Sequence, residues 1–455
     1  MNYDCIVKNG IVVTENDVFK GDIGIAGGKI VSIAQGEIDG TADNILQAEG
    51  KCVMAGAIDL HVHFNDPGRS EWEDWEHGTS AAAAGGVTTV GDMPINSLPP
   101  LTDTAALDAK IKAAGEKAVI DYIFWGGLVS NNLKEIPELF KRGITAFKAF
   151  MSNSGVEFAT ADDAILLEGL KFTRDLDCFI GVHAENDAIT SYYAKKLKAA
   201  GRTDRMAWVE SRPEVQELEA ISRFLLLLKH SEGKGHICHV SVSKGFDLIE
   251  EAKTAGIKVT AETCAHYLWF DQEDFAAKGP LLKCAPPLRS SSNRNELWKQ
   301  VLDGKVDFVT SDHSPCTENE KIKGNDNIWM AWGGVSGIQN TVPVLITEGV
   351  HKRNMPLTRL TRIISANPAK RAGIYGKKGL IGIGADADLM IIDLHKKWTF
   401  SKGEIKTKNK ISPYIGEEFT GAVEKTIIRG KLVFENGDIT CKSSGRYAGN
   451  LAGRV

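Results

Sequence analysis

The feature that most constrains the fold is a repeated alternation of short apolar segments and helical stretches between residues 57 and 375. Eight apolar segments have the length and composition of strands, and they begin near residues 57, 88, 121, 146, 178, 236, 259 and 306. Amphipathic stretches separate most of them, and the clearest begins at Leu218. Eight strand-then-helix units predict an α/β fold of the TIM (β/α)₈ barrel type. An open doubly wound sheet is the alternative, but no GxGxxG pattern follows any strand.

The two ends of the chain differ from the middle because they contain short strands broken by glycine turns. Asn9-Gly10 and Gly27-Gly28 are flanked by β-branched residues and indicate hairpin turns. Neither end is long enough to form a core alone, so we expect both to join in one small β-sandwich domain. The predicted division is residues 1–51 and 376–455 for this domain and residues 52–375 for the barrel.

Composition and charge exclude several classes of partner. Hydrophobic residues make up 43% of the chain and charged residues 25%, and the formal net charge is −5. This charge gives no electrostatic basis for binding nucleic acid or an anionic membrane. No apolar run approaches the ~20 residues of a membrane helix, and the first ten residues lack the pattern of a signal peptide. The eight scattered cysteines contain no CxxC pair, which argues against a disulfide framework. We expect a cytoplasmic protein with a small-molecule partner.

The sharpest local motif is Asp59-Leu-His61-Val-His63, on the first expected barrel strand. Residues two apart on a strand point to the same face, so the two imidazoles project together and Asp59 follows them. Such a pair can bind a metal, and a nearby carboxylate can orient it. The alternative is a pair of barrel-lining histidines that only form hydrogen bonds. Its place near the carboxyl end of a strand, where TIM barrels carry their active sites, favours the metal site.

Further polar residues occur near the ends of later strands: Lys148, His183, His239 and Asp312. Lys148 is unusual because it lies in the apolar segment AFKAFM, where an ammonium without a partner is costly to bury. Buried lysines tend to lose their proton, and a neutral amine can react with carbon dioxide to form a carbamate, an anionic oxygen ligand. The alternative is a lysine whose head reaches solvent, but the aligned histidines and Asp312 favour the ligand.

Three other histidines need separate treatment. His313 follows Asp312 and is either a residue that supports the site or a surface residue. His266, at the end of the seventh strand, is a candidate for contact with the substrate. His236 lies three residues before His239, so on a regular strand it faces the other way, and we leave it out of the site.

These residues together resemble the amidohydrolase superfamily, whose pattern is HxH on strand one, lysine on four, histidines on five and six, and aspartate on eight. The resemblance is strongest to the cyclic-amidase branch, which holds dihydroorotases, dihydropyrimidinases (hydantoinases) and allantoinases, and it covers essentially the whole chain. The segments that carry it are GAIDLHVHFNDPGRSEWEDWEHGTSAAAAGGVTTVGDMP, GVHAEN, HVSVSKG, LLKCAPPLR, SDHSPC and KISPYIG.

Fewer residues distinguish the members of this branch. Dihydroorotases carry an arginine two residues after the HxH motif to bind the substrate carboxylate, and Asn65 stands there in this chain. They also read MPNT where this chain reads MPINSLPP, with Asn96 one place later. Hydantoinases have a tyrosine shortly after the strand-four lysine, and the segment FKAFMSNSG has none. Ala285 replaces a serine that is frequent in relatives, a contact that we expect to use backbone groups. These features resemble the allantoinase family most closely.

The resemblance implies hydrolysis of the hydantoin ring of allantoin to allantoate. It implies two divalent ions bridged by carboxylated Lys148 and by a hydroxide, with Asp312 as catalytic base. Zinc is the expected metal, with cobalt, manganese or iron as alternatives. One ion would be held by His61, His63 and Asp312 and the other by His183 and His239. The expected substrate contacts are Asn96, Ala285, Ser314 and Gly334, the expected supporting residues are Asp59, His266 and His313, and the expected assembly is a homotetramer.

Four alternatives stay open from the sequence. A hydantoinase or dihydropyrimidinase is the nearest rival, and a dihydroorotase is more remote. A non-catalytic scaffold relative would be free to lose ligands, whereas all six are present here. A mononuclear deaminase of the same superfamily also uses HxH and a strand-eight aspartate, but Lys148 argues against it.

Overall fold

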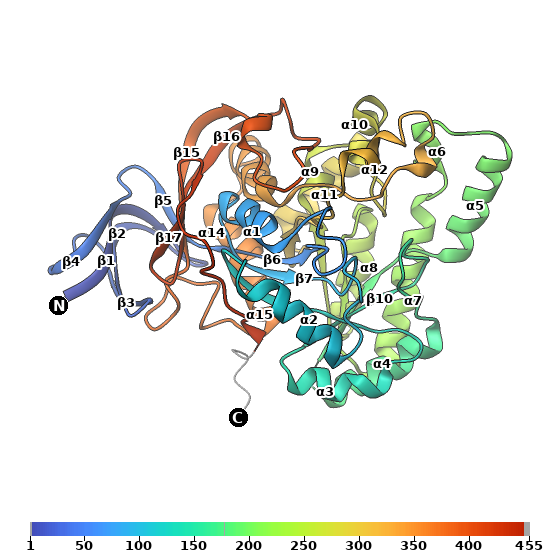
Figure 1. Ribbon diagram of the computed structural model, residues 1–455, viewed down its shortest axis with the longest axis horizontal. Coiled ribbons are helices and arrows are strands. Elements are labelled where there is room, and N and C mark those ends of the chain that lie inside the picture. The colour runs from blue at the N-terminus through green and yellow to red at the C-terminus, as the bar shows by residue number, and fades with distance from the viewer. Residues whose placement is uncertain (1, 177, 450–455) are drawn as a thin grey trace.

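The computed structural model describes residues 2–176 and 178–449, so the ends of the predicted division, residue 1 and residues 450–455, lie outside the described residues. Its centre is a ring of parallel strands, which confirms the predicted barrel (Figure 1). The strands are β6 (Ala57–Val62), β7 (Val87–Asp92), β8 (Asp121–Phe124) with β9 (Gly126–Gly127), β10 (Ala146–Phe150), β11 (Phe179–His183), β12 (Gly235–Ile237), β13 (Val259–Cys264) and β14 (Phe308–Thr310). A parallel bridge between Val62 and His313 joins the first strand to the segment after the last.

Helices cover the outside of the barrel, so its strands are buried on both faces and read as nearly continuous apolar runs. The helices are α1 (Trp75–Ala84), α2 (Thr104–Gly115), α3 (Ile136–Lys141), α4 (Asp163–Asp175), α5 (Asp187–Ala199), α6 (Arg205–Glu210), α7 (Glu214–Ser231), α8 (Ser243–Thr254), α9 (Ala265–Trp269), α10 (Gln272–Lys278), α11 (Ser291–Asp303), α12 (Glu318–Ile322), α13 (Thr341–Val344), α14 (Leu357–Thr361) and α15 (Asn367–Ala372). Within the described ranges, none of them combines the length and apolar character required to cross a membrane.

Local sequence signals set where several helices begin. Asp74, Asp103, Asp162 and Asn186 each accept a hydrogen bond from a backbone N–H in the first turn of the helix that follows. Short 3₁₀ or π segments complete the connections: η1 (Leu133–Glu135), η2 (Gly279–Leu282), η3 (Ile328–Met330), η4 (Ile338–Asn340), η5 (Leu345–His351), η6 (Arg362–Ala366) and η7 (Lys402–Glu404). The side-chain caps thus mark the first residues of α1, α2, α4 and α5.

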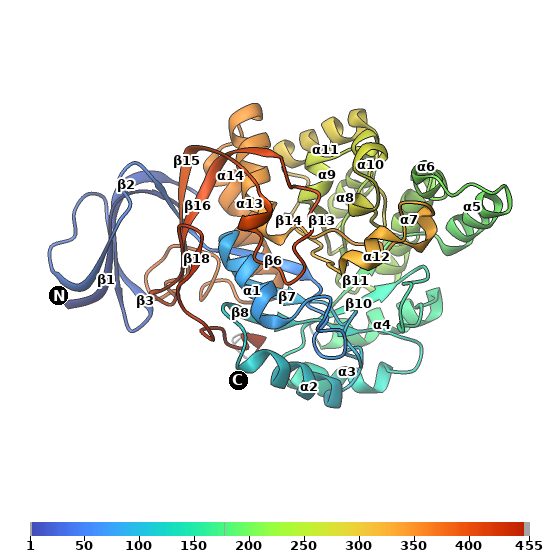
Figure 2. The ribbon, with the colours of Figure 1, turned by 45° about the horizontal axis from the view of Figure 1, so that its top comes forward.

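Strands from both chain ends form one separate sheet, as expected for the small β domain. Its strands are β1 (Asn2–Val13), β2 (Val18–Ala26), β3 (Lys29–Ala34), β4 (Thr41–Gln47), β5 (Cys52–Ala55), β15 (Leu389–Thr399), β16 (Glu418–Ile428), β17 (Lys431–Glu435) and β18 (Asp438–Ile439). β5 pairs with β1 from its own end of the chain and with β15 from the other end. Figures 1 and 2 show β15 and β16 between the N-terminal strands and the barrel. A single residue, Gly56, separates β5 from β6, and a Cβ there would lie 2.1 Å from Thr88 Cγ2.

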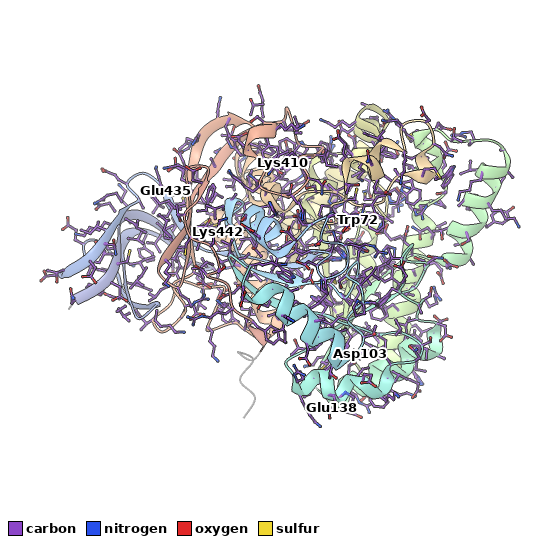
Figure 3. The ribbon with its side chains drawn as sticks, in the orientation of Figure 1. Trp72, Asp103, Glu138, Lys410, Glu435 and Lys442 are labelled. Carbon is purple, nitrogen blue, oxygen red and sulfur yellow. The ribbon has the colours of Figure 1, made fainter. Side chains whose placement is uncertain are left out.

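Several contacts hold the small domain to the barrel. The segment between β15 and β16 reaches the loop before α1, where Asn409 Nδ2 donates to Trp72 O at 2.7 Å. Trp72 and Lys410, both labelled in Figure 3, mark these two segments. On the other side, Lys378 Nζ lies 2.5 Å from carboxylate oxygens of Asp121 and Asp388 and 3.1 Å from Asp386.

Candidate functional site

The six predicted metal ligands line one cavity of about 300 Å³ at the carboxyl ends of the barrel strands. They are His61, His63, Lys148, His183, His239 and Asp312. All six are buried, and each lies at or close to the end of its strand. The barrel therefore brings together residues from five strands that are far apart in the sequence.

His61 and His63 both point one ring nitrogen at Asp312. The Nε2 atoms of the two histidines each lie 3.3 Å from Asp312 Oδ1. The other nitrogen of each ring has a separate partner: His63 Nδ1 donates to Ile95 O at 2.7 Å, and His61 Nδ1 bonds the Glu262 carboxylate. These partners fix the rings and leave the Nε2 lone pairs free for a cation. Burial would raise the pKa of Asp312, but His61, His63 and His266 lower it to about 2.

His183 and His239 form the second half of the cluster. His183 Nδ1 lies 3.0 Å from His239 Nε2, and His183 Nε2 lies 2.9 Å from Glu185 Oε2. Glu185 also accepts from Gln216 Nε2 at 2.8 Å. Burial raises the pKa of Glu185, but Arg212 and His183 lower it to about 2. The carboxylate therefore holds the proton on His183 Nε2, so Nδ1 presents its lone pair toward His239.

Lys148 supplies the test of whether these residues fit a metal centre. Its Nζ is buried and has no hydrogen-bond partner among the residues described. Burial raises the pKa of the neighbouring Cys238 thiol to about 12, so that thiol stays neutral and provides no countercharge. An unpartnered buried amine beside four histidines and an aspartate is expensive as an isolated group. Converted to a carbamate it would be an anion among nitrogen donors, and a donor set of imidazoles and carboxylates suits divalent metals.

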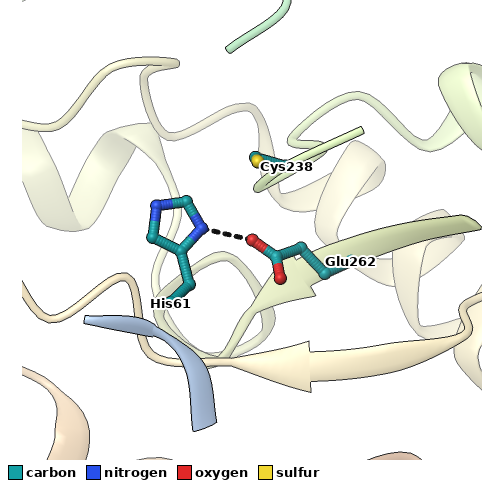
Figure 4. A group of neighbouring side chains, drawn as sticks. All are labelled: His61, Cys238 and Glu262. Atoms are coloured by element: carbon teal, nitrogen blue, oxygen red, sulfur yellow. Dashed lines mark hydrogen bonds and ion pairs between the residues drawn. The ribbon is translucent and has the colours of Figure 1, made fainter. Parts of the chain in front are cut away.

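Glu262 on β13 is a functional residue that sequence reasoning missed. It is fully buried and bonds His61, as Figure 4 shows, and its second oxygen lies 3.3 Å from His236 Nε2. Burial raises its pKa, but His61 and His236 reverse this and hold it well below the usual range. The signal was present, because a carboxylate in the buried segment VTAETC requires a partner. His236, left out of the predicted site, therefore contacts the residue that orients His61.

The predicted supporting residues lie around this cluster. Asp59 accepts from His61 N and from Ser311 N, each at 3.1 Å, and so ties β6 to the segment after β14. His313 Nδ1 accepts from Gly337 N at 3.2 Å, and its Nε2 lies 3.6 Å from the buried carboxylate of Glu73. Burial lowers the pKa of His313 to about 3, so the ring is neutral near pH 7. His266 is buried, but it is not among the described side chains that line the cavity.

Three of the four predicted substrate contacts line the cavity: Asn96, Ala285 and Ser314. The fourth, Gly334, is not among the described residues that line the cavity, although its neighbour Gly333 is, and Gly334 O accepts from Lys321 Nζ at 2.5 Å. The cavity wall also contains a group that the sequence did not indicate. This group consists of Glu185, Trp208, Arg212 and Lys283.

Comparison with known proteins agrees with this geometry. Residues 52–433 match the model of the amidohydrolase family. The fold is similar to that of an L-hydantoinase (dihydropyrimidinase) from Arthrobacter aurescens, with a TM-score of 0.95, 35% identity and coverage of 98% of this chain and 99% of that one. The chain belongs to the amidohydrolase family.

The curated relatives of the chain indicate a narrower class within the amidohydrolase family. An allantoinase from Rubrobacter xylanophilus is 43% identical over 98% of this chain and 97% of its own length. Another from Bacillus licheniformis is 41% identical over 96% and 97%. The chain is thus an allantoinase-type cyclic amide hydrolase with a candidate buried histidine and aspartate metal site, in which ligand atoms of His61, His239 and Asp312 lie within 4.8 Å of one another.

Proposed function

We propose that this protein hydrolyses the hydantoin ring of allantoin to allantoate. The observation that carries the proposal is the buried cluster of four histidines, Asp312 and an unpartnered Lys148 in one cavity. The curated allantoinases, similar over nearly the whole chain, support the choice of substrate. Asn65 supports it as well, because its Nδ2 donates to Pro315 O at 3.3 Å and the side chain offers no cation for a substrate carboxylate.

The metal content belongs to the same proposal. His61, His63 and Asp312 would hold one divalent ion and His183 and His239 the other, with carboxylated Lys148 between them. Zinc is the metal that we propose, with cobalt, manganese or iron able to take its place. When bound, such ions polarise a carbonyl group and acidify a water molecule. Glu262, Ile95 O and Glu185 hold the histidine rings in place for this purpose.

Asp312 would transfer the proton. Its carboxylate faces the cavity next to His61 and His63, where it can accept a proton from the attacking water. It would then return this proton to the departing ring nitrogen. General acid–base catalysis of this kind contributes about 10²–10⁴-fold to the rate. The backbone of Ala285 and the side chains of Asn96 and Ser314 line the space where the neutral ring would bind.

A hydantoinase or dihydropyrimidinase activity is the second candidate, because the L-hydantoinase structure matches this fold at a TM-score of 0.95. The family resemblance also supports a homotetramer, which analytical ultracentrifugation would test.

The first experiment is hydrolysis of allantoin by metal-loaded protein with bicarbonate present, in parallel with dihydroorotate, hydantoin and dihydrouracil. We expect allantoin to have the highest kcat/KM and a chelator to abolish turnover. Preferential turnover of hydantoin or dihydrouracil would move the assignment to the second candidate. Turnover unaffected by removal of metal would contradict the metal-dependent mechanism.

A further inference from the structure

One wall of the cavity is formed by side chains other than the histidines that face Asp312. Arg212 and Lys283 both lie against the indole of Trp208, with distances to the ring centroid of 3.5 Å for Arg212 Cζ and 4.1 Å for Lys283 Nζ. Trp208 is fixed because its Nε1 donates to Cys284 O at 2.8 Å. Because both side chains pack on the same indole ring, the three residues form a wall that carries hydrogen-bond donors. We call Trp208, Arg212 and Lys283 the donor wall.

The donor wall has N–H groups that the protein does not use. Arg212 Nε is buried and has no hydrogen-bond partner within the described part of the chain, and it lies 3.6 Å from Glu185 Oε1. Lys283 is 3% exposed, and its Nζ donates to Ala331 O at 2.6 Å. An ammonium or amine carries more than one donor, so Lys283 can bond a ligand as well. A buried donor without a partner, such as Arg212 Nε–H, is costly, which indicates that a ligand completes this wall.

The net charge of the wall selects the type of ligand. The charge of Arg212 is offset by Glu185, which lies beside it. Burial, together with Lys321 and Arg212, lowers the pKa of Lys283 to about 6, so near pH 7 its amine is mostly neutral. A neutral amine both donates and accepts hydrogen bonds. The wall is therefore suited to an uncharged planar group with carbonyl and N–H functions, and it is poorly suited to a carboxylate, which requires a net positive charge.

We propose that Arg212 and Lys283 bind the ureido substituent of the substrate while Trp208 stacks against its plane. This inference rests on the proposed function, because allantoin carries a ureido group on its ring and hydantoin carries none. The ring amide must lie at the metal ligands for hydrolysis, so the substituent must occupy another part of the same cavity. The donor wall lines that cavity together with His183 and Glu185. It therefore determines which ring substituent is accepted.

The chain provides a matched control for Lys283. Lys321 is also a buried lysine, and its Nζ donates to Trp332 O at 3.0 Å and Gly334 O at 2.5 Å. Both lysines thus hold the loop at residues 331–334, since Lys283 donates to Ala331 O. Only Lys283 of the two lies among the described residues that line the cavity. A role in loop structure alone would make the two substitutions equivalent.

The test compares Lys283→Met, Arg212→Lys and Lys321→Met in the metal-loaded enzyme. Allantoin is the substrate, and hydantoin is used as a second substrate or as a competing ligand. We expect Lys283→Met and Arg212→Lys to lower the preference for allantoin over hydantoin about tenfold or more, mainly through KM, because each removes a donor to the ureido group. Lys321→Met should change the values for both compounds by the same factor. Metal content and circular dichroism confirm that the variants are loaded and folded.

Two results would overturn the proposal. One is an unchanged preference in both Lys283→Met and Arg212→Lys, and the other is the same change of preference in Lys321→Met as in Lys283→Met. Arg212→Lys keeps the positive charge beside Glu185, so it provides an answer even where Lys283→Met fails to fold. Failure of the proposed function is a separate observation, because the unmodified enzyme would then not hydrolyse allantoin at all.

Discussion

Two buried lysines, one on a barrel strand and one at the junction between the barrel and the small domain, differ in their surroundings. Lys148 on β10 is fully buried among the histidines of the cavity and has no hydrogen-bond partner within the described ranges. Lys378 is 1% exposed and is surrounded by the carboxylates of Asp121, Asp386 and Asp388. Burial would lower the pKa of Lys378, but these three aspartates raise it above its usual value. The charge of Lys378 is thus compensated by carboxylates of the protein, whereas the amine of Lys148 lacks any such partner in the described residues.

This difference separates a structural site from a functional one. A buried charge that is removed from water must be compensated within the protein, and the cluster at Lys378 achieves this with protein groups alone. It also joins the start of β8 to the segment before β15, so it connects the barrel to the small domain. At Lys148 the compensation has to come from a chemical change or a ligand. An unpaired buried group is therefore a more specific sign of function than a buried group as such.

The largest expected effect is the loss of activity in Lys148→Met. Methionine fills a similar volume, so the fold should persist, and removal of an unpartnered amine should not lower the free energy of unfolding of the metal-free protein. The enzyme should lose about a thousandfold or more in kcat/KM, because on the proposed function it loses a metal ligand and the several kcal/mol that metal activation supplies. Steady-state kinetics and metal analysis measure this. A variant that retains a tenth of the activity with full metal content would show that Lys148 is not a ligand.

The sequence indicated the candidate metal ligands of the site better than the other residues that surround the cavity. Lys148 and the HxH pair could be found because strand alternation places residues on a known face. That rule fails beyond the strand end: β12 ends at Ile237, and His239 has a φ of 37°, so its direction cannot be counted from His236. Arg212 lies between α6 and α7 and Lys283 lies in a loop, where no periodicity applies. Their meeting on Trp208 depends on tertiary packing, which local sequence does not encode.

The second largest effect is on stability, in Lys378→Met. This substitution removes the cation that three buried carboxylates share, so that Asp121 keeps only Arg429, Asp386 keeps only Lys29 and Asp388 is left without a cation among the described residues. Breaking such a cluster costs about 3–5 kcal/mol of unfolding free energy. Urea denaturation measures the change. The matched control is Lys299→Met, because Lys299 is exposed and pairs with Glu296 at 2.6 Å on the surface of α11. That pair should contribute less than about 1 kcal/mol. Equal effects in the two variants would contradict the structural role assigned to the Lys378 cluster.

The smallest expected effect is that of Glu262→Gln, which extends the comparison from buried lysines to buried carboxylates. Glutamine keeps the shape and can still accept from His61 Nδ1, but it loses the charge that polarises the ring. We expect metal affinity to fall about 10–100-fold, as for other partners of metal-binding histidines. Competition with a chromogenic chelator measures the affinity of the folded protein.

The control for this last change is Glu217→Gln. Glu217 is equally buried, but it accepts from Ser241 N at 2.7 Å and pairs with Arg289 at 2.9 Å, so its partners are structural. Its substitution should lower the free energy of unfolding and leave metal affinity unchanged. If Glu262→Gln also changed stability alone, Glu262 would belong with Asp121 and Asp388 as part of the framework. Loss of metal affinity in Glu262→Gln but not in Glu217→Gln would show that a buried carboxylate serves function when its partner is a histidine facing the cavity.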